Sequence, residues 1–158
     1  MFFSRHTTLP ARLMDISQLR RQMAWQRVER PEDVASTFPR EAPQTRIRPE
    51  LEPLPDEAVF DKISFSALEG TLLNMARRNL GLESFAIVGV ATEIGVEPTV
   101  RHATDLGYVP VVISDACGAV NEEAGRRALA VLEHAGDAMF TDTVTISRLL
   151  REGGRATD

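Results

Sequence analysis

Short apolar runs alternate with amphipathic segments from residue 58 onward, and this alternation predicts strands and helices in turn. The runs expected as buried strands are Ala58–Asp61, Phe85–Val90, Val109–Ile113 and Ala138–Phe140. Continuous apolar character is typical of strands that are covered on both faces. The helices expected around them cover 66–80, 93–106, 121–136 and 141–150. Strand–helix alternation at this spacing predicts a parallel sheet with right-handed crossovers.

Local signals mark where several of these helices begin and end. Ser66 with a Glu three residues later has the spacing of a capping box, and Gly81 supplies a left-handed stop. Thr92 is expected to cap the next helix and Asn121 the one after it. Pro98 falls inside the helix expected over 93–106 and should bend it.

The first third of the chain has a different character. The segment Phe2-Phe3-Ser4-Arg5 reads as the end of a short strand, and helical spacing predicts a helix over 12–28. Seven of the nine prolines precede residue 56 and every glycine lies at or after Gly70, so 37–57 is expected to be an irregular excursion. We expect one domain over 1–150, followed by a frayed tail over 151–158.

Composition narrows the class of protein further. The 158 residues are 43% hydrophobic and 26% charged, as in an ordinary globular domain, and the formal net charge is −5. An acidic chain argues against nucleic acid as the main partner, because a surface that follows phosphates needs a basic excess. No apolar run reaches the ~18 residues of a membrane span. The single cysteine, Cys117, cannot form an internal disulfide, which predicts a reducing, cytoplasmic location.

The basic side chains are almost all arginines. Seventeen of the 18 basic side chains are arginines, and the only lysine is Lys62. An arginine keeps its proton in a protein, whereas a desolvated ammonium can lose it. Lys62 is therefore a candidate for acid/base work, and the alternative is that one lysine survived a codon bias by chance.

Three segments follow expected strand ends, namely 61–62, 91–95 and 114–118. Ligands of open α/β sheets bind beyond the carboxyl ends of the strands, so these segments are expected to share one functional edge.

The residues in these segments resemble a known family. The run VGVATEIGVEPTVRHATDLGYVPVVISDACG, over 88–118, is similar to the strand–turn–helix–strand segment of the isochorismatase-like, or cysteine hydrolase, superfamily. The likeness extends upstream through DEAVFDKISFSALEGT over 56–71 and more weakly downstream to about residue 150. FSRHTTLP, over 3–10, resembles the end of the second strand of the family.

This resemblance implies a three-layer α/β/α fold with a mainly parallel, Rossmann-type sheet. It implies catalysis by an Asp after the first strand, a Lys after the third and a Cys after the fourth. Lys62 takes the place of the Lys, and Gly95 stands where the family pattern G-V-A-T-x-x-C has its Cys. A cis peptide bond between Val90 and Ala91 is also implied, and family members form dimers or tetramers.

The chain departs from the family at two points. Gly95 closes the thiolate route, although isochorismatases proper also have Gly there and hydrolyse a vinyl ether with water by acid/base chemistry. Loss of activity is the alternative. In addition, nothing before Phe2 supplies the first strand with its Asp, so that strand is missing. The favoured explanation is that the numbered start lies downstream of the true one. The alternatives are that a partner chain fills the gap or that the N-terminal segment repairs the sheet.

The candidate site follows from these comparisons. Lys62 is expected to stabilise a developing anion, and the alternative is a salt bridge with Asp61 or Glu93. Glu93 is a candidate general acid, although a first-turn Glu commonly complements the helix dipole. The set expected to bind substrate or an oxyanion at the helix start is Val90, Ala91, Thr92 and Ile94.

Other reactive residues are given structural roles. Cys117 falls outside the nucleophile position and is interpreted as a buried thiol. The three histidines, His6, His102 and His134, are scattered, so no metal site is predicted, and no cofactor is implied.

The leading hypothesis is a hydrolase of a small polar, anionic metabolite that works by Lys-assisted acid/base chemistry. The alternative is a non-catalytic small-molecule-binding or assembly subunit that keeps the fold.

Overall fold

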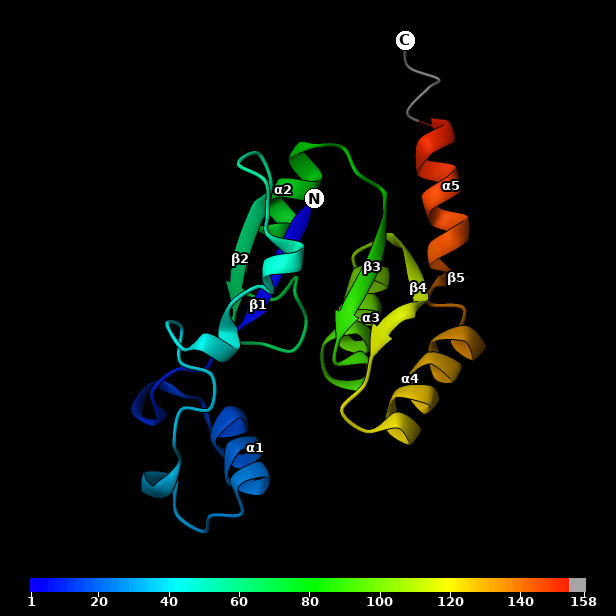
Figure 1. Ribbon diagram of the computed structural model, residues 1–158. Coiled ribbons are helices and arrows are strands. Elements are labelled where there is room, and N and C mark those ends of the chain that lie inside the picture. Colours follow the sequence, from blue (N-terminus) through cyan, green and yellow to red (C-terminus); the bar gives the residue numbers. More distant parts are fainter. Residues whose placement is uncertain (154–158) are drawn as a thin grey trace. The chain divides into compact units, whose positions relative to one another are not determined.

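The computed structural model describes residues 1–153, and the chain divides into two compact units (Figure 1). The first unit is Met1–Ser64, and the second begins at Phe65. Each unit has its own parallel sheet. The expectation of one domain over 1–150 stays a prediction.

The sheet of the first unit consists of two strands, β1 (Phe2–His6) and β2 (Ala58–Lys62). They pair in parallel, with Phe2 opposite Ala58 and His6 opposite Lys62. The ladder continues one residue further, because the Thr7 amide donates to the Lys62 carbonyl at 2.8 Å. Both strand ends therefore lie side by side, and the two predicted strands are present.

Helix α1 (Ile16–Gln26) is shorter than the helix expected over 12–28. Asp15 caps it, since its side chain accepts from the Gln18 amide, and Arg27 ends it in the left-handed conformation with φ 56°. Residues 11–13 form a separate 3-10 turn. The Pro-rich stretch 37–57 contains only two further 3-10 turns, Pro43–Thr45 and Pro49–Leu51.

Three parallel strands in the order β3-β4-β5 make up the sheet of the second unit. Their bounds are β3 (Ser84–Val90), β4 (Val109–Gly118) and β5 (Met139–Thr141). The α/β class with parallel sheets, expected from the alternation of apolar runs, is confirmed. Strand β4 is longer than predicted because its pairing with β3 resumes after a register shift between Ile87 and Gly89, with Gly89 opposite Cys117.

The core of the second unit joins its helices to this sheet. The helices are α2 (Leu73–Asn79), α3 (Glu97–Asp105), α4 (Glu122–Ala135) and α5 (Thr143–Gly153). Val100 of α3, Val112 of β4 and Leu132 of α4 are fully buried against one another. Asn121 caps α4 as predicted, accepting from the Ala124 amide at 2.9 Å, and Gly136 ends that helix in the left-handed conformation.

One predicted helix start is wrong. The helix expected over 66–80 begins only at Leu73, and the Ser66 hydroxyl contacts His102 Nδ1 at 3.0 Å. The helix expected over 93–106 starts where predicted, but its first turn, Thr92–Val96, is π-helical, and Pro98 lies in the first turn of α3. At the other end, α5 runs through Gly153, and the remaining residues of the expected tail, 154–158, lie outside the described residues.

Candidate active site

The turn that follows β3 is organised around one carbonyl oxygen. Ala91 O accepts hydrogen bonds from the amides of Ile94, Gly95 and Val96, at 3.2, 2.7 and 3.2 Å. The peptide bond between Val90 and Ala91 is cis. The sequence therefore brings all the residues predicted at this helix start, from Val90 to Gly95, into one tight turn.

Thr92 has a different role from the one predicted. Its hydroxyl does not cap the helix but donates to the Gly118 carbonyl at 2.9 Å, so it ties the turn to the end of β4. The side chain is 2% exposed. On its other side stands Gly125 of α4, where an added Cβ would lie 3.7 Å from Thr92 Cβ and only 2.4 Å from Ala119 Cβ. The turn is thus packed tightly against the first part of α4.

Gly95 occupies an open position in the same turn. A Cβ built at this residue meets no atom within 4 Å. The Gly95 carbonyl accepts a hydrogen bond from the Thr99 hydroxyl, which also accepts from the Ala67 amide at 2.9 Å. Close packing therefore does not explain why residue 95 is a glycine. The position has room for a side chain, but glycine supplies none that could react.

Glu93 is held as a carboxylate. Its Oε1 accepts hydrogen bonds from the amides of Val120 and Asn121, both at 2.9 Å. Hydrogen bonding to backbone amides lowers the pKa of Glu93 against the opposing effect of desolvation, which is the larger single influence. Glu93 Oε2 is buried without a hydrogen-bond partner among the described residues. An ionised group with a free oxygen suits a base or a charge stabiliser better than the predicted general acid.

Lys62 ends β2 in the first unit and is 9% exposed. Its Nζ donates to the Ser64 carbonyl at 3.0 Å. Desolvation by burial lowers the pKa of Lys62 from 10.5 to about 8. The neighbouring Asp61 carboxylate pairs with Arg5 and Arg40, both at 2.6 Å. A cation that is easily deprotonated at a strand end can carry or accept a proton near neutral pH.

A residue beside Lys62 was not among the predicted site residues. His6, expected to be one of three scattered histidines, lies directly opposite Lys62 in the β1–β2 register. Its Nδ1 is buried without a hydrogen-bond partner among the described residues. Desolvation, followed by the charge of Lys62, lowers the pKa of His6 from 6.5 to about 4, and a hydrogen bond with the Ser64 backbone opposes this. No sequence signal joins residues 6 and 62, because only the strand register brings them together.

Cys117 is part of β4 rather than a turn. It pairs with Gly89, and its Sγ lies 3.3 Å from the Ile113 carbonyl. Burial raises the pKa of the Cys117 thiol, which supports a structural, protonated thiol. Within residues 1–153, no group of three or more His, Cys, Asp or Glu side chains could hold a metal ion. The same residues contain no helix that is long and apolar enough to cross a membrane.

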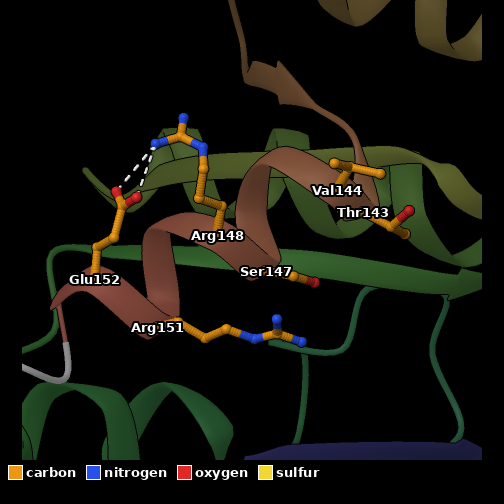
Figure 2. Close-up of a pocket in the computed structure, with 6 residues that line it drawn as sticks. All are labelled: Thr143, Val144, Ser147, Arg148, Arg151 and Glu152. Carbon is orange, nitrogen blue, oxygen red and sulfur yellow. Dashed lines mark hydrogen bonds and ion pairs between the residues drawn. The ribbon is translucent and has the colours of Figure 1, made fainter.

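Two further features of the second unit lie outside the predicted site. The Arg77 guanidinium, 2% exposed, stacks between the rings of Phe85 and Tyr108, whose centroids lie 4.0 and 3.6 Å from its Cζ. A surface pocket also follows α5 (Figure 2). Its lining residues are Thr143, Val144, Ser147, Arg148, Arg151 and Glu152. All six come from one helix, and an Arg148–Glu152 ion pair at 3.0 Å spans one side, so the pocket lacks the convergent groups of a catalytic site.

Comparison with known proteins defines the class. The isochorismatase domain family matches residues 1–145, and the chain therefore belongs to the isochorismatase family. The isochorismatase family protein YwoC of Bacillus subtilis is 35% identical over 75 residues, 48% of this chain and 40% of the relative. Ureidoacrylate amidohydrolase RutB of Acinetobacter baylyi is 35% identical over 68 residues, 43% of this chain and 28% of the relative. The chain thus spans less than half the length of these relatives.

Solved structures support the same fold. A cysteine hydrolase from Pseudomonas syringae pv. phaseolicola gives a TM-score of 0.74 at 20% identity, over 96% of this chain and 71% of the other. An isochorismatase-like hydrolase from Alkaliphilus metalliredigens gives 0.73 at 17% identity, over 94% and 72%. The nicotinamidase of Staphylococcus aureus is 28% identical, over 57% of this chain and 58% of the other, with a TM-score of 0.52.

Proposed function

We propose that the protein is a hydrolase of a small polar, anionic metabolite and uses water instead of a thiol as nucleophile. Gly95 carries this proposal. It stands where the family pattern has its cysteine, and its open surroundings leave room above the turn without supplying a nucleophile. Water must then attack the substrate directly, with charge stabilisation and proton transfer supplied by neighbouring groups.

Lys62 supplies the positive charge in this proposal. An ammonium that is 9% exposed stabilises a developing anion more strongly than one in water, because little solvent screens it. The turn after β3 supplies hydrogen-bond donors. The Ile94 amide already donates to Ala91 O, so we give Ile94 a structural role. We assign the amides of Ala91 and Thr92 to the binding of an oxyanion.

The second candidate is a binding or assembly subunit without catalysis. Three backbone amides that donate to Ala91 O favour this second candidate. Because their N–H groups are used within the turn, fewer donors are left to stabilise a transition state. A binding subunit would retain substrates unchanged, whereas the hydrolase turns them over.

A hydrolysis screen separates these candidates. The full chain is incubated with small amides and ureido acids, including nicotinamide and ureidoacrylate, and with vinyl ether acids, and the products are followed by mass spectrometry. We expect turnover of at least one anionic compound and a loss of at least 100-fold in Lys62→Ala, because the anion loses its counter-charge. Arg78→Ala, which removes an exposed cation, serves as the control and keeps full activity.

The outcomes are distinct. Equal turnover by the wild type and Lys62→Ala would remove Lys62 from the mechanism. Tight binding without any turnover would favour the subunit. Thr92→Val tests the turn of the second unit separately, and unchanged turnover in this variant would remove Thr92 from the mechanism.

We further propose a cytoplasmic homo-oligomer, either a dimer or a tetramer. Exposed apolar side chains on one strand support it, since Val88 and Val90 of β3 are 52% and 81% exposed. Light scattering after size-exclusion chromatography measures the mass, and a monomer at micromolar concentration would contradict the proposal.

A further inference from the structure

The ends of β1 and β2 hold a pair of basic side chains, Lys62, which takes the place of the family Lys, and His6, to which the resemblance gives no role. His6 and Lys62 are direct register partners in a parallel pair, so both lie on the same strand edge. The ladder past them is fixed by the hydrogen bond from the Thr7 amide to the Lys62 carbonyl. Thr7 is 7% exposed and Lys62 9%, so the ends of the two strands are buried in the first unit.

The Ser64 backbone lies beside both side chains. Lys62 Nζ donates to the Ser64 carbonyl at 3.0 Å. The Ser64 backbone also acts on His6, where it raises the pKa against the larger, opposing effect of burial. Nδ1 of His6 is buried without a hydrogen-bond partner among the described residues. A neutral ring with its proton on Nε2 presents an acceptor lone pair on this nitrogen.

The rest of the surroundings keep this ring neutral. The Phe38 ring packs edge-on against His6, with centroids 5.9 Å apart. Phe38 is itself held by its amide, which donates to the Thr8 hydroxyl at 2.9 Å. The charged groups that act on His6 are Lys62 from β2 and Arg21 from α1, and both are cations that disfavour a second positive charge.

We propose that His6 is the general base of this hydrolase and takes the proton of the attacking water on Nδ1. The proposal rests on the proposed hydrolysis by water, which needs a proton acceptor that Gly95 cannot supply. With its proton on Nε2, His6 has a vacant acceptor, and Lys62 stands beside it as the counter-charge for the oxygen that becomes negative.

The reaction balances without any further reactant. For an acyl substrate, the water oxygen forms a bond to the carbonyl carbon, the carbonyl π pair moves onto oxygen beside Lys62, and one water proton passes to Nδ1 of His6. When the intermediate collapses, the bond to the leaving group breaks, its electron pair stays with the leaving group, and His6 returns the proton there. A ring with a pKa of about 4 is as strong a base as a typical aspartate.

The first test needs no substrate. In long-range proton–nitrogen NMR spectra of the full wild-type chain, we expect His6 to carry its proton on Nε2 and to stay neutral down to about pH 5. His134, which is exposed at the end of α4, serves as the reference histidine in the same spectra. A proton on Nδ1 of His6, or a His6 ring that is already charged at pH 6, would overturn the proposal.

The second test uses the compound that the screen identifies. His6→Gln keeps a planar polar side chain with an N–H but removes the basic nitrogen, and His134→Gln is the matched control. We expect kcat of His6→Gln to fall at least 100-fold with KM within about threefold, and His6→Gly to regain turnover when imidazole is added. Thermal unfolding of each variant confirms that it is folded.

The outcomes separate this proposal from the proposed function. If Lys62→Ala loses turnover while folded His6→Gln keeps it, the hydrolase stands and His6 is not its base. If both variants keep wild-type turnover, the Lys-assisted mechanism fails together with the role of His6. If the wild type hydrolyses nothing in the screen, the proposed function fails. The role of His6 as a general base then fails as well, whichever tautomer the NMR spectra show.

Discussion

Lys62 should weaken the fold that carries it, and replacing it by Met should therefore stabilise the protein. Burial lowers the pKa of Lys62 from 10.5 to about 8, so the ammonium is less favourable in the folded chain than in the unfolded one. At about 1.4 kcal/mol for each pH unit, this difference corresponds to about 3 kcal/mol. Met has a similar length and no charge, and it removes this cost.

The substitution also removes a favourable contact. Lys62 Nζ donates to the Ser64 carbonyl at 3.0 Å, and losing such a bond costs about 1–2 kcal/mol. The net expectation for Lys62→Met is a gain of about 1–2 kcal/mol in the free energy of unfolding at pH 7. Gains of this size on removal of a functional group are expected where a site is held at the expense of stability.

The pH dependence of this gain has a definite sign. The cost of the buried ammonium is fully present below pH 8, where the group is charged in both states. It shrinks between pH 8 and 10.5, where only the unfolded chain holds the proton, and it is absent above 10.5. Lys62→Met should thus be more stable than the wild type at pH 7 and no more stable at pH 10.5.

Urea denaturation at these two pH values, followed by circular dichroism, measures the effect. Arg78→Met removes an exposed cation and should change the free energy of unfolding by less than about 0.5 kcal/mol at both pH values. A Lys62→Met variant that is less stable than the wild type at pH 7, or equally affected at both pH values, would refute the reasoning.

Two packing predictions concern the second unit. Gly125→Ala should lower the free energy of unfolding by about 1–2 kcal/mol, because its Cβ would lie 2.4 Å from Ala119 Cβ and the clash outweighs the helix propensity gained. Urea denaturation should show recovery in the double variant with Ala119→Gly, and a stabilised single variant would contradict this. Arg77→Lys should destabilise by about 1–3 kcal/mol although the charge is kept, since an ammonium cannot stack between two rings; an unchanged melting curve would contradict it.

Local signals in the sequence predicted much of the fold. Continuous apolar runs located β2, β3, β4 and β5, although the expected burial on both faces is wrong for β3, where Val88 and Val90 are 52% and 81% exposed. Asn121 and Gly136 marked the ends of α4 because their preferences arise within a few residues. Lys62 was placed correctly at the end of β2 for the same reason.

Predictions failed where a distant partner decided the local structure. Ser66 had the spacing of a capping box, but its hydroxyl contacts His102, 36 residues away. Thr92 looked like a helix cap, but its hydroxyl is committed to Gly118, 26 residues away. The pairing of His6 with Lys62 is of the same kind, since parallel register joins residues that share no local pattern. Rules that consider only neighbouring residues in the sequence cannot predict such partners.

The free space at Gly95 has an evolutionary consequence. An added Cβ there would touch nothing within 4 Å, and the residue does not require a positive φ. A cysteine could therefore enter by one substitution, with no backbone rearrangement. The step from the proposed direct hydrolysis to covalent acyl transfer would thus require a new side chain at residue 95 and no change in the surrounding scaffold.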